Sequence, residues 1–283
     1  MSPRRLRLDA ELVRRGLARS RDHASELIAE GRVTVSGARA TKPATGVTTD
    51  VALVVIDDPD RPDYVSRGGH KLAGALAAFG ADGLVVEGRR CLDAGASTGG
   101  FTDVLLRAGA REVVAVDVGY GQLAWSLQSD DRVVVRDRTN IRDLSLELVG
   151  EPVDLVVGDL SFISLTLVLE PLLGVMAPDG DLALMVKPQF EVGKDRVGKG
   201  GVVRDPELWV EAVATVAAAA AARGWGARQV TASPLPGPSG NVEFFLWLRR
   251  GTATLESEHR DAVVRVGVRS DMGRSAPGEK VVP

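Results

Sequence analysis

The sequence has very few of the residues that form disulfides or bind metals. Only one of its 283 residues is cysteine, and three are histidine. Cys91 therefore cannot form an internal disulfide, and its apolar neighbours predict a buried strand residue. His23, His70 and His259 are scattered along the chain without a second cysteine, so we expect no metal site.

Long apolar runs are also missing. The longest uncharged apolar stretch, from Ala212 to Ala222, is eleven residues, whereas a transmembrane helix needs roughly 20. The chain does not open with a basic segment, an apolar core and a small-residue cleavage site. We therefore expect no membrane span, no secretion signal and a cytoplasmic location.

The composition itself is that of a globular protein. The chain is 45% hydrophobic and 26% charged, with a formal net charge of −3. These values exclude collagen-like, disordered and coiled-coil classes. The length fits one large domain with a small domain attached.

The charge is distributed unevenly along the chain. Residues 1–42 hold ten Arg and Lys against five Asp and Glu, a balance of +5, whereas the other 241 residues hold 25 against 33, a balance of −8. A small basic segment on an acidic remainder favours a polyanionic partner such as nucleic acid. A solvated helical surface would show the same bias, so this feature alone leaves both interpretations open.

The basic segment predicts a small α+β domain over residues 1–58. Apolar spacing predicts one helix over 8–15 that ends at Gly16, and a second helix that Ser20 caps and Gly31 ends. Alternating valines up to the dipeptide Ser36-Gly37 predict a hairpin. Residues 59–66 are the expected linker, because prolines interrupt both periodicities just there.

Residues 67–250 alternate short apolar runs with longer helical patterns. The expected strands are 90–93, 113–118, 133–135, 154–157, 182–186, 229–232 and 243–248. Most of these runs are rich in Val and Leu without polar alternation, which is typical of strands covered on both faces. They predict an α/β fold with a doubly wound, mainly parallel sheet. A loop rich in Pro and Gly separates the last two strands, so we expect the final strand to be antiparallel.

Residues 251–283 form a polar tail. One amphipathic helix is expected near residues 255–266, and we expect the last fifteen residues to be disordered.

The first of these strands leads into a glycine-rich sequence, Asp93-Ala-Gly-Ala-Ser-Thr-Gly-Gly-Phe101, before a helical pattern. Glycines at such a turn let the backbone approach a ligand, and the helix N-terminus offers free N–H groups. Asp117 ends the next strand, where this fold places a carboxylate for ribose hydroxyls. The pair predicts a cofactor that contains a nucleoside, with a purely structural glycine turn as the alternative. The third glycine of the dinucleotide fingerprint is missing.

Charged residues follow the ends of several predicted strands. Asp137, Asp159 and Lys187 each follow a strand, Glu243 opens the last one, and Lys71 precedes the first. Because the carboxyl ends of parallel strands meet at one edge of a sheet, these groups are expected to converge there. A structural salt-bridge cluster is the alternative to a catalytic site.

These residues carry a family resemblance. Lys71, Asp159, Lys187 and Glu243, with the glycine-rich loop, resemble the Lys-Asp-Lys-Glu tetrad of FtsJ-type ribose 2′-O-methyltransferases. The surrounding strings are similar to those of the TlyA family: Ser-Arg-Gly-Gly-His-Lys-Leu, Gly-Asp-Leu-Ser-Phe-Ile-Ser, Val-Lys-Pro-Gln-Phe-Glu-Val-Gly-Lys and Gly-Pro-Ser-Gly-Asn-Val-Glu-Phe-Phe. The N-terminal segment resembles the S4 RNA-binding module. The linker departs from the family pattern, with Tyr64 in place of a tryptophan.

The resemblance implies a Rossmann-like class I methyltransferase sheet of seven strands behind an S4-like domain. It implies S-adenosylmethionine as the cofactor, and Lys71, Asp159, Lys187 and Glu243 as catalytic residues. The cofactor-binding residues that it implies, with the glycine-rich loop, are Gly95, Ala96, Ser97, Gly99, Gly100, Phe101, Asp117, Val118, Asp137 and Asp159. The RNA-binding residues that we expect are Arg4, Arg5, Arg7, Arg14, Arg19, Ser20, Arg21 and Arg32.

The activity implied by the resemblance is methylation of cytidine in bacterial ribosomal RNA, 16S, 23S or both, with a link to capreomycin susceptibility. Ribosomal RNA or subunits would be the partner, and no obligate protein partner is evident. A lysine can accept the proton of a ribose hydroxyl only if burial or a neighbouring cation lowers its pKa. Lys71 beside Lys187 would supply that cation, with Asp159 and Glu243 orienting the groups.

Three other functions compete. A dehydrogenase would use the same sheet, but the missing glycine and the lack of a suitable His or Tyr disfavour it. A pseudouridine synthase would need a catalytic Arg-Leu-Asp motif outside the N-terminal segment, whereas the only copy is Arg7-Leu-Asp9. A non-catalytic RNA-binding or haemolysin-like protein is the remaining alternative, and it would not need a lysine such as Lys187 at a strand end.

Overall fold

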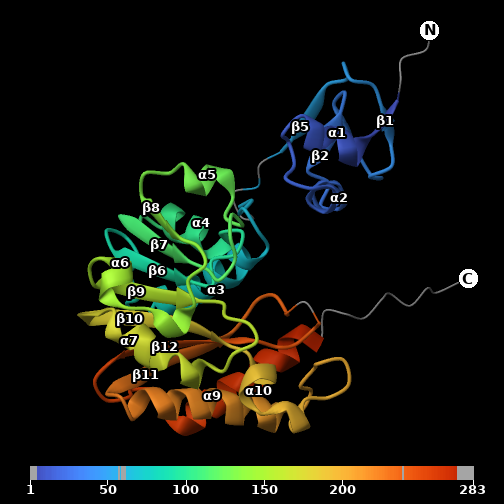
Figure 1. Ribbon diagram of the computed structural model, residues 1–283. Coiled ribbons are helices and arrows are strands. Elements are labelled where there is room, and N and C mark those ends of the chain that lie inside the picture. The colour runs from blue at the N-terminus through green and yellow to red at the C-terminus, as the bar shows by residue number, and fades with distance from the viewer. Residues whose placement is uncertain (1–4, 57, 59–61, 238, 273–283) are drawn as a thin grey trace, which may run out of the picture. The chain divides into compact units, whose positions relative to one another are not determined.

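The computed structural model describes residues 5–56, 58, 62–237 and 239–272 (Figure 1). The chain divides into two compact units, Met1–Val65 and Ser66–Pro283. The expected RNA-binding residue Arg4 lies outside the described residues.

The first unit has two short helices and two small antiparallel sheets. Its elements are β1 (Leu6–Arg7), α1 (Leu8–Arg14), α2 (Arg21–Ala29), β2 (Val33–Val35), β3 (Ala38–Arg39), β4 (Gly46–Val47) and β5 (Leu53–Val55). Strand β1 pairs with β4, and β2 lies between β3 and β5. The predicted order of helix, helix and hairpin is confirmed.

Local chemistry explains why these helices begin and end where they do. Gly16 follows α1 in the left-handed region, at φ +72°, where a side chain would be strained. Ser20 Oγ accepts a hydrogen bond from His23 N and so caps α2, as predicted. Leu8, Leu12 and Leu27 form the buried core with their neighbours.

The second unit contains one seven-stranded sheet. Its strands are β6 (Arg90–Ala94), β7 (Glu112–Val116), β8 (Val133–Arg136), β9 (Val153–Gly158), β10 (Met176–Val186), β11 (Trp225–Ala232) and β12 (Phe244–Arg250). The order is β11-β12-β10-β9-β6-β7-β8. The strands β10, β9, β6, β7 and β8 pair in parallel, and β12 is antiparallel to both neighbours. The predicted α/β class, the number of strands and the antiparallel last strand are confirmed.

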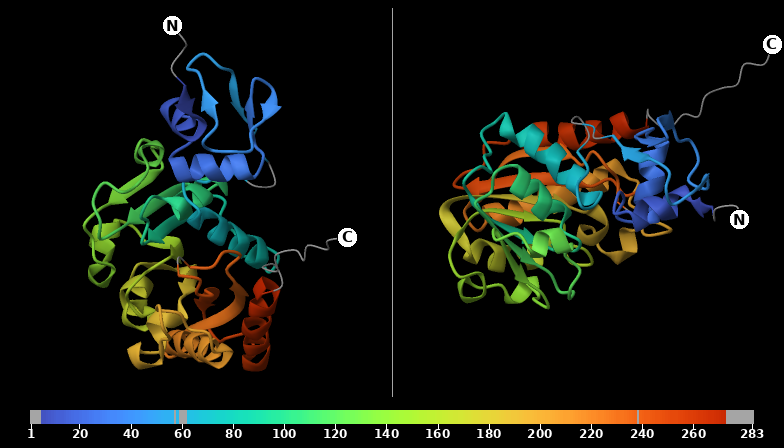
Figure 2. Two further views of the ribbon diagram at one scale, coloured as in Figure 1. Left: turned by 90° about the vertical axis from the view of Figure 1, so that its right-hand side faces the viewer. Right: turned by 90° about the horizontal axis from the view of Figure 1, so that it is seen from above.

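Helices cover both faces of this sheet (Figure 2). The helices of the second unit are α3 (Gly68–Gly80), α4 (Gly100–Arg107), α5 (Trp125–Gln128), α6 (Leu146–Val149), α7 (Leu169–Gly174), α8 (Pro188–Glu191), α9 (Pro206–Ala221) and α10 (Ser257–Met272). Single 3₁₀ turns lie at η1 (Ile141–Asp143), η2 (Leu165–Leu167) and η3 (Lys194–Arg196).

Strand β12 shows how the two faces are filled. Phe245 and Trp247 point to one face, where their rings lie 5.8 Å from those of Phe101 on α4 and Phe79 on α3, respectively. The alternate residues of β12 belong to the core on the other face, together with α7 and α9. Burial on both faces explains why these strands lack polar alternation. Cys91 on β6 is fully buried, as predicted.

The strand order reverses at the centre of the sheet. From β6 the chain runs outward through β7 and β8, and it then returns to β9 on the other side of β6. Loops from the two strands therefore diverge at the carboxyl ends of β6 and β9, which leaves a crevice there in open α/β sheets.

The C-terminal region is more ordered than predicted. Helix α10 contacts β11 and α9, Val264 is fully buried, and Arg265 forms an ion pair with Glu207 of α9 at 2.7 Å. The helix runs to Met272 and so includes residues 269–272, the first four of the fifteen for which we expected disorder. Residues 273–283 lie outside the described residues. None of the helices described in the chain is long and apolar enough to cross a membrane.

Candidate active site

The glycine-rich loop joins β6 to α4 at this crevice. Gly95 and Gly99 have φ +85° and +98°, a region that strains any residue with a side chain. A Cβ at Gly99 would also lie 2.2 Å from Leu127 of α5. The loop is therefore compact because both positions are glycine, and the N-terminus of α4 is left facing the crevice.

Asp117 lies opposite this loop, after β7. Its Oδ2 accepts a hydrogen bond from Ser97 N at 2.8 Å, and its Oδ1 accepts one from Gly119 N at 2.7 Å. A carboxylate has about four acceptor positions, so capacity for ribose hydroxyls remains. Val118 is 70% exposed and lies just beyond β7, which ends at Val116 and not at 118 as predicted.

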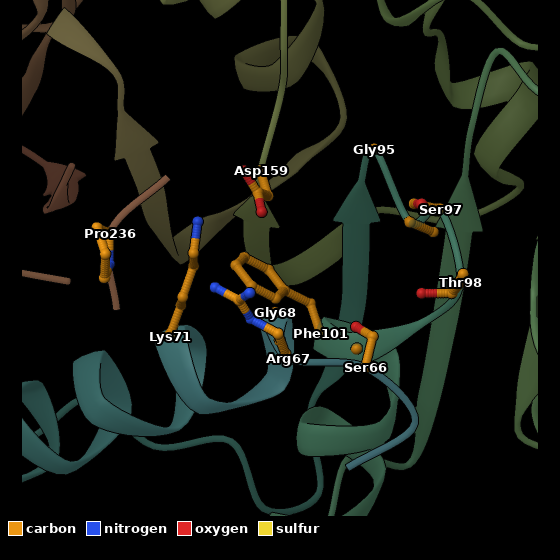
Figure 3. Close-up of a pocket in the computed structure, with 12 residues that line it drawn as sticks. Ser66, Arg67, Gly68, Lys71, Gly95, Ser97, Thr98, Phe101, Asp159 and Pro236 are labelled. Atoms are coloured by element: carbon orange, nitrogen blue, oxygen red, sulfur yellow. The ribbon is translucent and has the colours of Figure 1, made fainter. Parts of the chain in front are cut away.

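Two cavities lie along the crevice and share Gly95, Ser97 and Asp159. The first, about 350 Å³, is lined on one side by the loop and on the other by Lys71 and Pro236 (Figure 3). The second, about 580 Å³, is lined by Asp117, Val118 and the residues that follow β8 and β9. Asp137 lines neither cavity, and its Oδ2 accepts a hydrogen bond from Gly121 N at 2.8 Å.

Most of the residues expected to bind the cofactor line the first cavity. Gly95, Ala96, Ser97, Gly100, Phe101 and Asp159 line it. Gly99 lines neither cavity, and its role is to allow the tight turn of the loop.

The four expected catalytic residues form two separate ion pairs. Lys71 Nζ lies 2.5 Å from Glu243 Oε2, and Lys187 Nζ lies 2.6 Å from Asp159 Oδ1. Each lysine is only 7% exposed and Glu243 is 1% exposed. An unpaired charge at such burial would cost several kcal/mol, so each lysine has its own carboxylate as counter-charge.

Each pair has a further neighbour within the site. Lys187 Nζ also donates to Ser161 Oγ at 2.8 Å. Lys71 Nζ lies 3.9 Å from Met185 Sδ. Glu243 Oε1 is buried without a hydrogen-bond partner among the described residues, so one oxygen of this carboxylate still has an acceptor position to fill.

The loop before β12 determines where the Glu243 carboxylate can lie. A Cβ added at Gly237 would lie 2.6 Å from Glu243 Oε1. Asn241, only 3% exposed, accepts from Val203 N at 2.9 Å and donates to Gly201 O at 2.8 Å. Two hydrogen bonds thus attach the loop that carries Glu243 to the segment 201–203.

Asp93, the first residue of the glycine-rich sequence, is buried completely on β6. Thr102 Oγ1 donates to its Oδ2 at 2.7 Å, and its Oδ1 has no hydrogen-bond partner among the described residues. Burial raises the pKa of Asp93 to about 7, although the bonds from Thr102 oppose the shift.

The structure adds residues to which the sequence assigned no role. Ser161 and Phe162 follow Asp159, and Phe190 and Glu191 follow Lys187. Phe162 is 91% exposed, and its ring centroid lies 5.4 Å from that of Phe190. All four stand in the strings that carry the family resemblance, and that was their only signal.

The expected RNA-binding residues of the first unit are mostly exposed but already ion-paired. Arg7 and Arg21 both contact Asp9, at 2.8 and 3.0 Å. Arg14 contacts Glu11, Arg19 contacts Asp63, and Arg32 contacts Glu30. Arg5 and Ser20 are exposed. Tyr64, where the family pattern has tryptophan, is 9% exposed.

The site meets the requirements of a nucleoside cofactor with an amino-acid tail. The two cavities share three lining residues. Asp117 offers acceptors in the second cavity, and the N-terminus of α4 offers backbone donors in the first. Glycine at 95 keeps that space open, because a Cβ there would lie 3.2 Å from Asp159 O and from the Leu160 side chain. Among the described residues, no group of three His, Cys, Asp or Glu is placed to hold a metal ion.

The fold and the site define a class of protein in which a small RNA-binding domain precedes a methyltransferase domain. Residues 6–51 match the S4 domain, and residues 64–250 match the FtsJ-like methyltransferase. The chain is therefore a methyltransferase.

Comparison with individual proteins narrows this class. The 16S/23S rRNA (cytidine-2′-O)-methyltransferase TlyA of Mycobacterium tuberculosis is 62% identical over 88% of this chain and 91% of its own. Hemolysin A of Brachyspira hyodysenteriae is 35% identical over 84% of this chain and 98% of its own. A solved structure, a provisionally named hemolysin from Streptococcus thermophilus, has a TM-score of 0.71 at 33% identity, over 96% of this chain and 100% of its own. The chain belongs to the TlyA family.

The raised pKa of Asp93 predicts a pH-dependent contribution to stability. The folded protein retains a proton on Asp93 that the unfolded chain releases near pH 4, so the free energy of unfolding falls as pH rises from about 4 to about 7. Asp93→Asn removes this group, and the variant should lose that part of the slope in urea unfolding curves recorded from pH 4 to pH 8. The exposed Asp131→Asn should keep the slope of the unmodified protein; equal slopes for all three proteins would contradict the assignment.

Proposed function

We propose that this chain transfers a methyl group from S-adenosylmethionine to the ribose 2′-oxygen of a cytidine in bacterial ribosomal RNA, in the 16S, the 23S or both. One observation carries the proposal: two buried lysine–carboxylate pairs border the cavity that the glycine-rich loop encloses. The relative from M. tuberculosis, whose name states this reaction, supports the acceptor. A ribosomal substrate implies a cytoplasmic location.

The residues of the chain supply the proton chemistry. A ribose hydroxyl is a weak nucleophile near neutral pH, so a general base must accept its proton. Once the Lys187 ammonium has released its own proton, the free amine would take the proton of the 2′-hydroxyl as the 2′-oxygen attacks the methyl group and the thioether leaves. Asp159 Oδ1, 2.6 Å from Lys187 Nζ, would stabilise the ammonium that forms again. Bound S-adenosylmethionine supplies the electrophilic methyl group on its sulfonium.

Lys71 and Glu243 orient the acceptor. Glu243 Oε1, buried and unpartnered among the described residues, is suited to accept a hydrogen bond from the substrate hydroxyl or a bridging water. Lys71, held on the other carboxylate oxygen, adds positive charge next to the reacting centre. Holding both reactants in line supplies much of the rate enhancement, since orientation is worth as much as general-base catalysis or more.

The exposed Phe162 suits a nucleotide substrate. Its ring stands at the rim of the second cavity against Phe190, one residue from Ser161, which contacts Lys187. Enzymes that modify one nucleotide take it out of the stack, and an aromatic face then replaces the neighbouring base. We infer that Phe162 holds the base of the target nucleotide.

The S4 unit would bind RNA through phosphate contacts. Arg5, Arg7, Arg14, Arg19, Ser20 and Arg21 lie exposed on this unit. Carboxylate partners hold the guanidinium groups of Arg7, Arg14, Arg19 and Arg21 in position, and the exposed charges can still contact phosphates. Loss of the activity would reduce susceptibility to capreomycin-type antibiotics. The alternative, a haemolysin-like function without methyl transfer, has support only in the names of relatives.

The first test is transfer of labelled methyl from S-adenosylmethionine to purified, unmodified 30S and 50S subunits, followed by nucleoside analysis. We expect label in 2′-O-methylcytidine, and Lys187→Ala should lower the rate by about 10²–10⁴-fold because the general base is lost. Cofactor affinity, measured by calorimetry, should stay within about threefold, since Lys187 lines neither cavity.

Exposed Lys194→Ala is the matched control and should retain kcat. No label on either subunit, with the cofactor still bound, would assign the enzyme to a different RNA. An unchanged rate in Lys187→Ala would show that another group accepts the proton.

Gly237→Ala tests the role of Glu243 without changing a charged residue. The new methyl group would lie 2.6 Å from Glu243 Oε1 and displace the carboxylate from Lys71. We expect kcat to fall by about 10–100-fold, with unchanged cofactor affinity. Gly80→Ala is the control, because a Cβ there meets nothing within 4 Å. Full activity of Gly237→Ala would argue against the proposed orientation of Glu243.

Arg21→Ala tests the S4 unit. Binding of ribosomal RNA should weaken, and the slope of log affinity against log salt should flatten by about one, because one phosphate contact is lost. Fluorescence anisotropy at several salt concentrations measures both values. Arg223→Ala, at an exposed position just after α9, serves as the control and should leave the salt slope unchanged. An unchanged slope in Arg21→Ala would exclude the Arg21 side chain as a phosphate contact.

A further inference from the structure

The loop that follows β9 has an energetically unfavourable backbone conformation at its centre. Phe162 has φ +64°, a left-handed conformation that is an outlier for a bulky side chain. Its ring is 91% exposed and contacts Phe190, so burial of the ring does not explain the conformation. Such strain persists only where surrounding contacts fix the backbone.

Those contacts come from one short segment, Lys187 to Glu191, which leaves β10 and forms α8. At the start of the loop, Lys187 contacts Asp159 and Ser161. In the middle of the loop, the Phe190 ring packs against the Phe162 ring, with the two ring planes tilted by 49°. The β9 loop therefore lies along α8 from its first residue to its centre.

Glu191 holds the far end of the same loop. Its Oε2 accepts from Ser164 Oγ at 2.6 Å, and its Oε1 accepts from Leu165 N at 2.8 Å. Both carboxylate oxygens thus accept hydrogen bonds from two consecutive residues, one from the side chain of Ser164 and one from the backbone of Leu165. Hydrogen bonds to a carboxylate are about twice as strong as those between neutral groups.

We propose that Glu191 is a positioning residue, which fixes the loop from Asp159 to Ser164 so that Phe162 is presented to the target nucleotide. It touches neither cavity lining and acts through Phe162. This inference rests on the proposed function for its catalytic consequence, whereas the mechanical link between Glu191 and the loop does not depend on it.

The choice of substitutions follows from the two hydrogen bonds. Alanine at 191 leaves Leu165 N without its side-chain acceptor and removes one partner of Ser164 Oγ, which keeps its contact with Thr166 Oγ1. Glutamine keeps one carbonyl oxygen for Leu165 N, and its amide N–H can donate to Ser164 Oγ, so Glu191→Gln should retain the loop. Glu170→Ala removes an exposed carboxylate of α7 and is the matched control.

The first measurement is amide hydrogen exchange in the full-length protein without substrate. In Glu191→Ala, exchange at Leu165 and its neighbours should accelerate about tenfold or more, as expected for loss of a charge-assisted hydrogen bond. Glu191→Gln should stay within about threefold of the unmodified protein, and Glu170→Ala should not change. Unaltered exchange in Glu191→Ala would overturn the proposal.

The second measurement separates positioning from general stability. With 30S and 50S subunits as acceptors, Glu191→Ala should lower kcat/KM about tenfold or more at unchanged cofactor affinity, and Glu191→Gln should restore it. In a Phe162→Ala background, the further loss on Glu191→Ala should shrink to less than about threefold, because the two residues act as one unit.

Two results would contradict the inference. In the first, the losses of kcat/KM caused by Phe162→Ala and Glu191→Ala multiply in the double variant. In the second, Glu191→Ala accelerates amide exchange but leaves kcat/KM unchanged. Failure of the proposed function is a different outcome. If the unmodified protein transfers no methyl group to either subunit, the exchange measurement still decides whether Glu191 holds the loop.

Discussion

The burial of two lysine ammonium groups is the constraint on which the site depends. Lys71 and Lys187 are each almost fully buried, and each would be costly there without a counter-charge. Their partners, Glu243 and Asp159, come from other segments of the chain. The two pairs therefore fix the relative positions of α3 and of the segments that follow β9, follow β10 and precede β12.

Sheet topology delivers these four segments to one edge. The carboxyl ends of β9 and β10 meet there because the two strands are parallel. Strand β12 is antiparallel, so its first residue, Phe244, pairs with Val186 at the end of β10. Glu243 consequently stands beside Lys187 in the sheet, whereas a parallel last strand would carry it to the opposite edge. The reversal between β6 and β9 opens the adjacent cavities.

Rigidity at this edge comes from contacts among loops. Gly95 and Gly99 allow a tight turn beside the first cavity, and Gly237 leaves room for the Glu243 carboxylate. The strained backbone at Phe162 is held by contacts with the segment after β10. A site that must align a hydroxyl with a methyl group gains from such fixed loops, since small displacements are costly in rate.

The sequence by itself determined the fold class and the strands, because Val-rich runs and glycine turns are local signals. Charged strand ends and the family resemblance together predicted the tetrad. The sequence also indicated Ser20 as a cap and Cys91 as buried. Tertiary structure alone decided which lysine pairs with which acid. It also decided that Asp137 lines neither cavity and accepts a hydrogen bond from Gly121 N instead. It likewise decided that Phe162 is exposed and that Glu191 holds its loop. These features depend on contacts between segments far apart in the chain, which no local pattern encodes.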